Sequence, residues 1–127
     1  MSSKKIIQTD SAPAAIGPYS QAVLVGNTLY CSGQICIDAQ SGDLVNADIG
    51  KETDQVMKNI RAVLHAAEMD FSHVVKATIY MTNMADYSEI NKVYASYFGD
   101  DPPAREAVEV SVLPKNVSVE ISVIASK

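Results

Sequence analysis

The chain has 127 residues, of which 47% are hydrophobic and 20% charged, and its 15 acidic and 10 basic side chains give a formal charge of −5. This length and apolar content predict a single domain, residues 1–127, with its own core, and exclude a disordered or collagen-like chain. With no signal peptide, no membrane-spanning run and no disulfide framework expected, we predict a cytoplasmic protein without a membrane partner. The acidic balance argues against nucleic-acid binding, because phosphates would be repelled.

The N-terminal part of the chain predicts short strands separated by turns. Residues 4–8 have an apolar centre and predict an edge strand or an ordered arm. Residues 20–25 and 28–32 flank Gly26-Asn27, which is typical of a tight two-residue turn, so these segments predict a β-hairpin. We expect residues 33–37 to extend this hairpin.

Two helices are predicted from apolar residues at helical spacing. The first covers residues 51–68, and its buried stripe contains Val56, Ile60, Val63 and Ala67. The second covers residues 87–98, and its buried stripe contains Ile90, Val93, Tyr94 and Tyr97. Asp86 and Glu89 resemble a capping box at its start, and Gly99 is well placed to end it.

Three further strands are predicted in the second half of the chain. Residues 74–82 have the two-residue period of a strand. One face of this strand would carry Val75, Ala77, Ile79 and Met81. Residues 105–112 and 117–125 are joined across a turn at Pro114. Two helices for five or six strands can cover only one face of a sheet, so we predict an α+β fold of about six strands. The other face then meets water or another subunit.

The cysteines and histidines show no spacing that favours catalysis or metal binding. Cys31 and Cys36 are five residues apart, which fits neither a redox pair nor a zinc motif, so we expect buried reduced thiols rather than a nucleophile. His65 and His73 are eight residues apart and do not form the helical pair of a metal site. We therefore predict no metal.

Two short segments each allow a structural and a functional interpretation. Residues 17–21, with the sequence Gly-Pro-Tyr-Ser-Gln, form either a ligand-binding loop or a turn that leads into a strand. Gly33, between Ser32 and Gln34, marks either a bulge or the close approach of a ligand. Taken alone, neither segment decides the question.

Arg105 and Glu120 are the most informative charged residues. Arg105 follows the rigid Pro102-Pro103 pair, so it is either an exposed arginine paired with Asp101 or Glu106, or a guanidinium that binds a substrate carboxylate. Glu120 lies in an apolar segment where an unpaired carboxylate is costly, and there it can orient a water molecule or transfer a proton. Spacing alone leaves both interpretations open.

Several segments combine into a recognisable pattern that runs from Ala12 to Ala125: Gly17-Pro18-Tyr19-Ser20-Gln21-Ala22, Gly26-Asn27-Thr28-Leu29-Tyr30 and Ser32-Gly33-Gln34-Ile35. The most specific part is the C-terminal signature Arg105-x-x-Val108-x-Val110-x-x-Leu113-Pro114-x-x-x-x-Val119-Glu120-Ile121. Together they resemble the Rid (YjgF) family of reactive-intermediate deaminases, in its arginine-containing RidA type.

The resemblance implies a chorismate-mutase-like α+β fold with a mixed sheet, assembled as a homotrimer with its sites in the clefts between subunits. It also implies a hydrolase that needs no cofactor. The substrates would be short-lived 2-imino acids, which are tautomers of enamines such as 2-aminoacrylate. They would be converted to 2-keto acids and ammonia, as by a 2-iminobutanoate/2-iminopropanoate deaminase.

The resemblance also implies roles for individual residues. Arg105 would bind the substrate carboxylate and Glu120 would orient the attacking water, while the cleft would be lined by Tyr19, Ser32, Gly33 and Asn91. One subunit would supply Arg105 and Glu120, and its neighbour would supply some of the lining residues.

The chain departs from the family pattern at Glu106, at Ala107 and in the turn at residues 115–118, which bears on substrate range. Two other functions stay open. One is a non-catalytic trimer that binds a small ligand or a protein. The other is an RNA-acting translation inhibitor, which the acidic charge disfavours.

Overall fold

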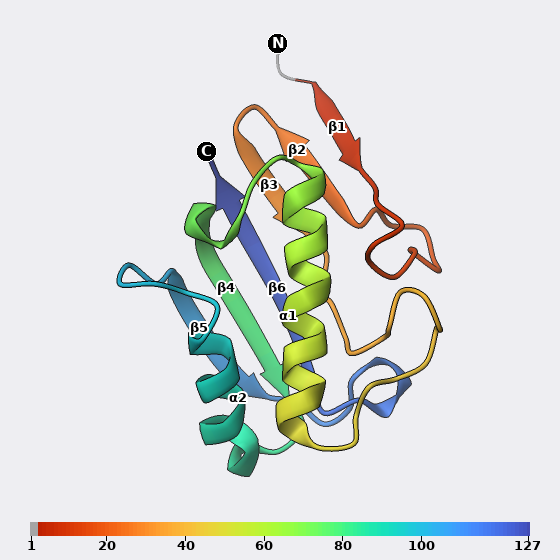
Figure 1. Ribbon diagram of the computed structural model, residues 1–127, viewed down its shortest axis with the longest axis vertical. Helices are drawn as coiled ribbons and strands as arrows, with labels where there is room; N and C mark the ends of the chain where they lie inside the picture. The colour runs from red at the N-terminus through yellow and green to blue at the C-terminus, as the bar shows by residue number, and fades with distance from the viewer. Residues whose placement is uncertain (1–2) are drawn as a thin grey trace.

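The computed structural model describes residues 3–127, in which both helices lie against one face of a single sheet (Figure 1). The sheet consists of β1 (Lys4–Ile7), β2 (Ala22–Val25), β3 (Thr28–Cys31), β4 (Val74–Met81), β5 (Ala104–Glu109) and β6 (Val119–Ser126). Its strand order is β1-β2-β3-β6-β4-β5, with β4 and β5 parallel and all other neighbours antiparallel. The predicted α+β fold with a mixed six-stranded sheet is confirmed.

The long helix α1 (Ile49–Ala66) begins two residues before the predicted start. The backbone N–H of Lys51 donates to the side chain of its N-cap, Asp48 (2.8 Å). No glycine follows the helix; instead Glu68 takes the left-handed φ of 59°, and the N–H of Met69 reaches back to the carbonyl of Leu64 (2.9 Å). This is the Schellman arrangement, formed with glutamate in the position that usually favours glycine.

The short helix α2 (Tyr87–Ala95) begins where it is predicted and ends three residues before its predicted end. The cap at its start differs from the expectation. The predicted capping box is wrong, because the Asp86 side chain caps nothing there. Asn83 instead caps a 3-10 turn, Met84–Asp86, which leads directly into α2. Beyond Ala95 the backbone bonds shorten to the i, i+3 pattern, so the chain leaves the helix before Gly99 is reached.

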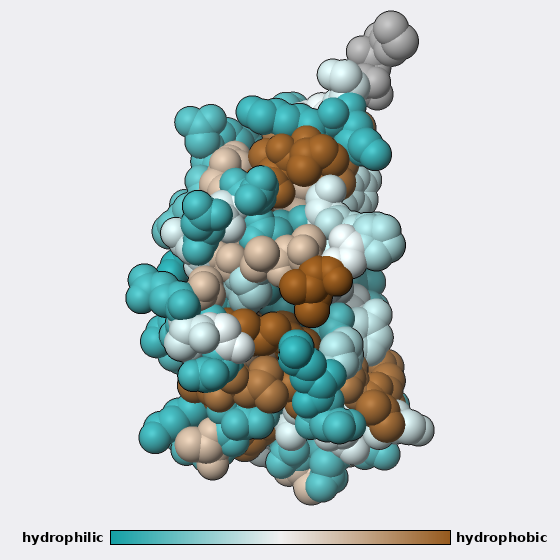
Figure 2. Space-filling view, turned by 90° about the vertical axis from the view of Figure 1, so that its right-hand side faces the viewer, coloured by the Kyte–Doolittle hydropathy of each residue, from teal (hydrophilic) through white to brown (hydrophobic). Residues whose placement is uncertain are grey.

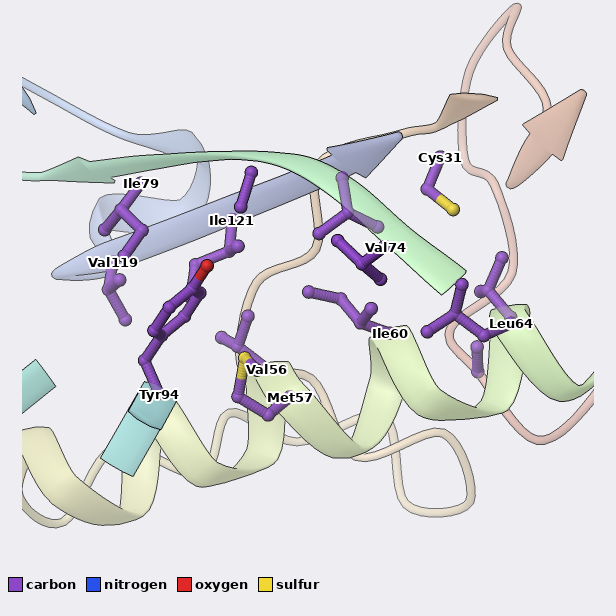
Figure 3. Close-up of a cluster of buried hydrophobic side chains, with 14 of the residues drawn as sticks. Cys31, Val56, Met57, Ile60, Leu64, Val74, Ile79, Tyr94, Val119 and Ile121 are labelled. Carbon is purple, nitrogen blue, oxygen red and sulfur yellow. The ribbon is translucent and has the colours of Figure 1, made fainter. Parts of the chain in front are cut away.

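The hydrophobic core lies between the sheet and the two helices (Figure 3). Alternate residues of β6 point into it, as do the apolar residues along one side of α1, and the fully buried set includes Val56, Ile60, Leu64, Ile79, Val119 and Ile121. Each such side chain contributes about 1.5–3 kcal/mol by its removal from water. The buried stripe that the sequence predicts for α1 therefore fixes the helix against β4 and β6.

Two details of the strands differ from the sequence expectations. Residues 33–37 do not extend the hairpin; they form only an isolated bridge from Gln34 to Ile121, while Ile37 bridges to Leu44. Val75 is 51% exposed rather than buried, because a register shift between Val74 and Lys76 turns it away from the core. The hairpin itself is confirmed, with its two strands joined by residues 26–27.

The face of the sheet away from the helices carries exposed apolar side chains. Tyr30 on β3 is 50% exposed and Val108 on β5 is 39% exposed. The prediction that the helices cover only one face is therefore confirmed. Within the described residues, neither helix is both long and apolar enough to pass through a membrane.

Candidate functional site

Arg105 lies on the helix side of β5, where α2 holds its guanidinium in place. Its Nη1 donates to Oδ1 of Asn91 (2.7 Å), and its Nη2 donates to the hydroxyl of Tyr87 (2.6 Å). The guanidinium carbon lies 5.1 Å from the ring centre of Tyr94 and 5.6 Å from that of Tyr87. Two hydrogen bonds and two aromatic rings thus fix a planar cation in one orientation.

The surroundings of Arg105 decide between its two interpretations. Glu106 lies on the opposite face of the sheet, where it pairs with Lys76 (2.7 Å) and accepts a hydrogen bond from Thr78 (2.5 Å). These two donors hold the pKa of Glu106 below its usual range. Among residues 3–127, no carboxylate lies within ion-pair distance of Arg105. A half-buried, oriented arginine without a carboxylate partner among the described residues is available to bind an anion from outside.

A cavity of about 690 Å³ lies at the end of the sheet where β2 and β6 begin and β3 ends. In Figure 1 the loops that border it lie at the lower right, and apolar residues gather in patches on this side of the molecule (Figure 2). Its polar lining includes Tyr19, Ser32 and Glu120, and its apolar lining includes Ile16 and Ile35. Four of the predicted site residues, with Gly33 among them, are thus brought together here.

Glu120 and Gly33 are in close contact inside this cavity. A Cβ atom at Gly33 would lie only 2.0 Å from Oε2 of Glu120, so no larger residue fits there while the carboxylate keeps its position. Burial raises the pKa of Glu120, because the charged form loses water. The glycine therefore marks the close approach of the Glu120 side chain, which is neither the bulge nor the ligand that the sequence suggested.

The cavity walls are held by hydrogen bonds from the side chains of Gln21 and Ser32. Gln21 is buried, its Oε1 accepts from the N–H of Thr9 (2.7 Å), and its Nε2 donates to the carbonyls of Thr9 (3.0 Å) and Pro13 (2.8 Å). Ser32 donates to the carbonyl of Ser20 (2.5 Å). These bonds tie the loop that carries Tyr19 to the end of β3.

The turn before β6 also borders the cavity, and it is one of the places where the chain departs from the family pattern. Lys115 lines the cavity. Lys115 and Asn116 take left-handed φ angles of 56° and 57°, which suit glycine best. The non-glycine residues are held in this conformation after Pro114, and they place a lysine side chain at the edge of the cavity.

Glu52 is a further residue that sequence reasoning missed. It is 3% exposed, and its Oε2 accepts from the backbone N–H groups of Ser118 (2.7 Å) and Val119 (3.0 Å). Burial raises its pKa, although these two donors act in the opposite direction. Glu52 thus fastens α1 to the residues directly before Glu120. A glutamate in the first turn of a helix does not by itself indicate that it accepts hydrogen bonds from a distant strand, so the sequence did not predict this role of Glu52.

One copy of the chain does not bring all the predicted residues together. Arg105 and Asn91 meet on the helix side of the sheet, whereas Glu120, opposite Tyr80 in the register, faces the other side together with the cavity. A small substrate cannot contact both faces of one sheet. The expectation that one subunit supplies both Arg105 and Glu120 to the same site is therefore wrong.

The cysteines lie apart from proton-transfer partners. Cys31 is buried, and burial raises its pKa to about 12, so the thiol stays protonated at neutral pH. Burial, followed by the charge of Glu52, also raises the pKa of Cys36. Within residues 3–127, no group of three or more His, Cys, Asp or Glu side chains is arranged to hold a metal ion.

We expect Cys31→Ser and Cys36→Ser to retain catalytic activity, because neither thiol is placed to become a thiolate. Each variant should lose about 1–3 kcal/mol of stability, since a hydroxyl replaces a buried thiol. Turnover measured beside a thermal melt tests this. A variant that stays folded but loses turnover would assign a cysteine to the mechanism.

Comparison with known proteins agrees with this architecture. The sequence model of the family described as "Endoribonuclease L-PSP" matches residues 9–127. A RutC family protein from Pyrococcus horikoshii is 51% identical over 124 residues, which covers 98% of both chains. The 2-iminobutanoate/2-iminopropanoate deaminase of Bos taurus is 51% identical over 122 residues, covering 96% of this chain and 89% of that one. Escherichia coli TdcF, solved with bound serine, superposes with a TM-score of 0.93 at 37% identity, covering 97% and 98% of the two chains.

A Rid protein from Yersinia pestis superposes with a TM-score of 0.96 at 52% identity, covering 98% of this chain and all of that one. The fold thus defines a mixed-sheet α+β protein like these relatives. The chain belongs to the Rid (YjgF) family, as its sequence pattern indicated.

Proposed function

We propose that the protein hydrolyses small 2-imino acids, such as 2-iminopropanoate and 2-iminobutanoate, to 2-keto acids and ammonia. The observation that carries the proposal is the guanidinium of Arg105, which is oriented by α2 and has no carboxylate partner in the described chain. Relatives from cattle and human that bear the name of this deaminase, at 51% and 45% identity, support it. The comparisons show the family, and the substrate is what we propose.

The chemistry follows from the two groups. Arg105 binds the carboxylate of the imino acid and so fixes C2 of the substrate. Glu120 accepts a proton from a water molecule. At the same time the water oxygen bonds to C2, and the C=N electron pair moves to nitrogen. The proton then passes to that nitrogen, which gives a carbinolamine. Glu120 next transfers the hydroxyl proton to the amino nitrogen, the C–N bond breaks, and ammonia leaves as the keto group forms. Burial, which raises the pKa of Glu120, makes it a stronger base than an exposed glutamate.

The site is formed between two copies of the chain. Arg105 and Glu120 face opposite sides of the sheet, so one copy supplies Arg105 and Asn91, and its neighbour supplies Glu120 and the cavity. The exposed apolar residues on the open face give neighbouring copies a surface to cover. The resemblance to the family supports three copies.

The reaction can be tested by producing the imine in place. An amino-acid oxidase converts alanine or 2-aminobutanoate to the imino acid, and the remaining imine is trapped with an amine nucleophile and followed by absorbance. With the protein present, the trapped imine should decrease while keto acid and ammonia form faster. Unchanged imine decay over a range of protein concentrations would contradict the proposal. Binding of the 2-keto acid without acceleration would support the non-catalytic alternative.

The position of the site between copies predicts that two inactive variants restore one another. Arg105→Ala and Glu120→Gln chains, unfolded together in equal amounts and refolded, should regain activity in roughly a quarter of their sites, because each such site then combines an intact arginine with an intact glutamate from its neighbour. Each variant refolded alone is the control. Light scattering of the intact protein should give three times 13.6 kDa. A mixture as inactive as the separate variants would contradict the shared site.

The family description names an endoribonuclease, which makes RNA a second candidate substrate. The charge of −5 counts against it, since a polyphosphate gains little from an acidic surface. The single oriented arginine suits one small carboxylate better than a chain of phosphates.

A further inference from the structure

The side chains around Arg105 offer several hydrogen-bond donors to an incoming ligand. We propose that the hydroxyl of Tyr87 is a second ligand of the substrate carboxylate, beside the guanidinium of Arg105. This inference rests on the proposed function, in which Arg105 binds that carboxylate. It adds a binding residue from α2, which neither the sequence pattern nor the comparisons assign to the site.

The direction of each hydrogen bond around Arg105 is fixed by chemistry. A guanidinium has five N–H donors and no acceptor, so both of its partners must accept. The hydroxyl oxygen of Tyr87 accepts from Nη2 at 2.6 Å, and Oδ1 of Asn91 accepts from Nη1 at 2.7 Å. The single phenolic proton of Tyr87 therefore points away from Arg105. The two N–H groups of the Asn91 amide also point away from it.

One lone pair of each of these two oxygens, on Tyr87 and on Asn91, is used by Arg105, and the cluster still offers several donors to an incoming ligand. These donors are the O–H of Tyr87, the amide N–H groups of Asn91 and the N–H groups of Arg105 that remain unbonded. A carboxylate is their natural ligand, since it accepts at both oxygens and donates at none. Bonds of this kind, with an ionised acceptor, are roughly twice as strong as those between neutral groups.

Tyr87 is also accessible to a ligand. Its side chain is 36% exposed, and Arg105 is half-buried beside it. The second tyrosine that stacks on the guanidinium differs in this respect. Tyr94 is buried, and its hydroxyl oxygen is shielded from solvent and has no hydrogen-bond partner among the described residues. Of the two rings, only that of Tyr87 can offer its hydroxyl to a carboxylate.

Binding of 2-oxobutanoate, a stable keto acid, can be measured by calorimetry on the assembled protein. Tyr87→Phe keeps the aromatic ring and should raise the Kd by about tenfold. In the imine assay the same variant should raise KM to a similar extent and change kcat little. The matched control is Tyr97→Phe, because the Tyr97 hydroxyl donates to Asp54 (2.5 Å) on α1 and not to the Arg105 cluster. It should lower the melting temperature without changing the Kd.

Replacing Tyr87 with 3-fluorotyrosine separates a ligand from a residue that only positions Arg105. The fluorine makes the phenol a stronger donor and a weaker acceptor. At a pH where the phenol stays protonated, the Kd should fall if the hydroxyl donates to the carboxylate. A rise in Kd would show that Tyr87 serves only as an acceptor for Arg105, and would overturn the inference.

The proposed function has a separate test within the same measurements. If Arg105→Ala abolishes binding of 2-oxobutanoate while Tyr87→Phe leaves the Kd unchanged, the role of Tyr87 is refuted and the carboxylate site at Arg105 is retained. If Arg105→Ala also binds normally, the carboxylate site itself is refuted.

Discussion

Replacing Arg105 with alanine is expected to lower kcat/KM for imine hydrolysis by about 10²–10³-fold, because the substrate loses both the charge and the planar pair of donors that orient its carboxylate. Arg105→Lys keeps the charge, but it cannot donate to both Asn91 and Tyr87 and still present a flat fork, so most of the activity should still be lost. Initial rates with the oxidase-generated imine measure both variants.

The fold should survive the loss of this side chain. Arg105 forms no ion pair within residues 3–127, so its removal leaves no carboxylate without a partner. Circular dichroism and light scattering should show an unchanged fold and assembly. If Arg105→Ala turned over imine at the original rate, the carboxylate site would lie elsewhere and the mechanism would be refuted.

Gly33→Ala is expected to lower kcat by about 10²-fold through Glu120 rather than through the glycine itself. The new methyl group would lie 2.0 Å from Oε2 and 2.9 Å from the carboxyl carbon of Glu120, so the carboxylate must move. Because Arg105 keeps its position, KM should change less than kcat. Gly99→Ala is the matched control, since a Cβ there meets nothing within 4 Å.

A double-mutant cycle tests whether the two residues act together. Glu120→Gln alone should lower kcat about as much as Gly33→Ala, and the double variant should be little worse than either, because both remove the same correctly placed base. Additive losses in kcat would instead show that Gly33 affects catalysis independently of Glu120.

The elements that the sequence predicts well are those whose signal is local. The stripe of Val56, Ile60 and Val63 defines α1, and the turn at Gly26-Asn27 defines the β2–β3 hairpin. The errors arise where a tertiary contact changes a local pattern. The register shift in β4 exposes Val75, and the 3-10 turn capped by Asn83 replaces the expected capping box.

The site shows the same division. Tyr19, Ser32, Gly33 and Glu120, which the family pattern places in one cleft, share one cavity, and their roles stay predictions. Strand alternation places Arg105 and Glu106 on opposite faces of β5, but it does not say which face meets the helices. That depends on the pairing of β5 with β4, two segments that the sequence does not align. For the same reason, no local signal revealed that Glu52 reaches Ser118 and Val119.

The position of β6 has a consequence for how the protein is made. The last strand along the chain lies between β3 and β4, where it joins the β1–β3 half of the sheet to the β4–β5 half. On the ribosome the two halves cannot combine until Val119–Ser126 has left the exit tunnel, and until then β3 and β4 each have an open edge that can pair with another chain. Completion of the sheet therefore waits for β6. Chains stopped before Val119 are expected to aggregate rather than fold.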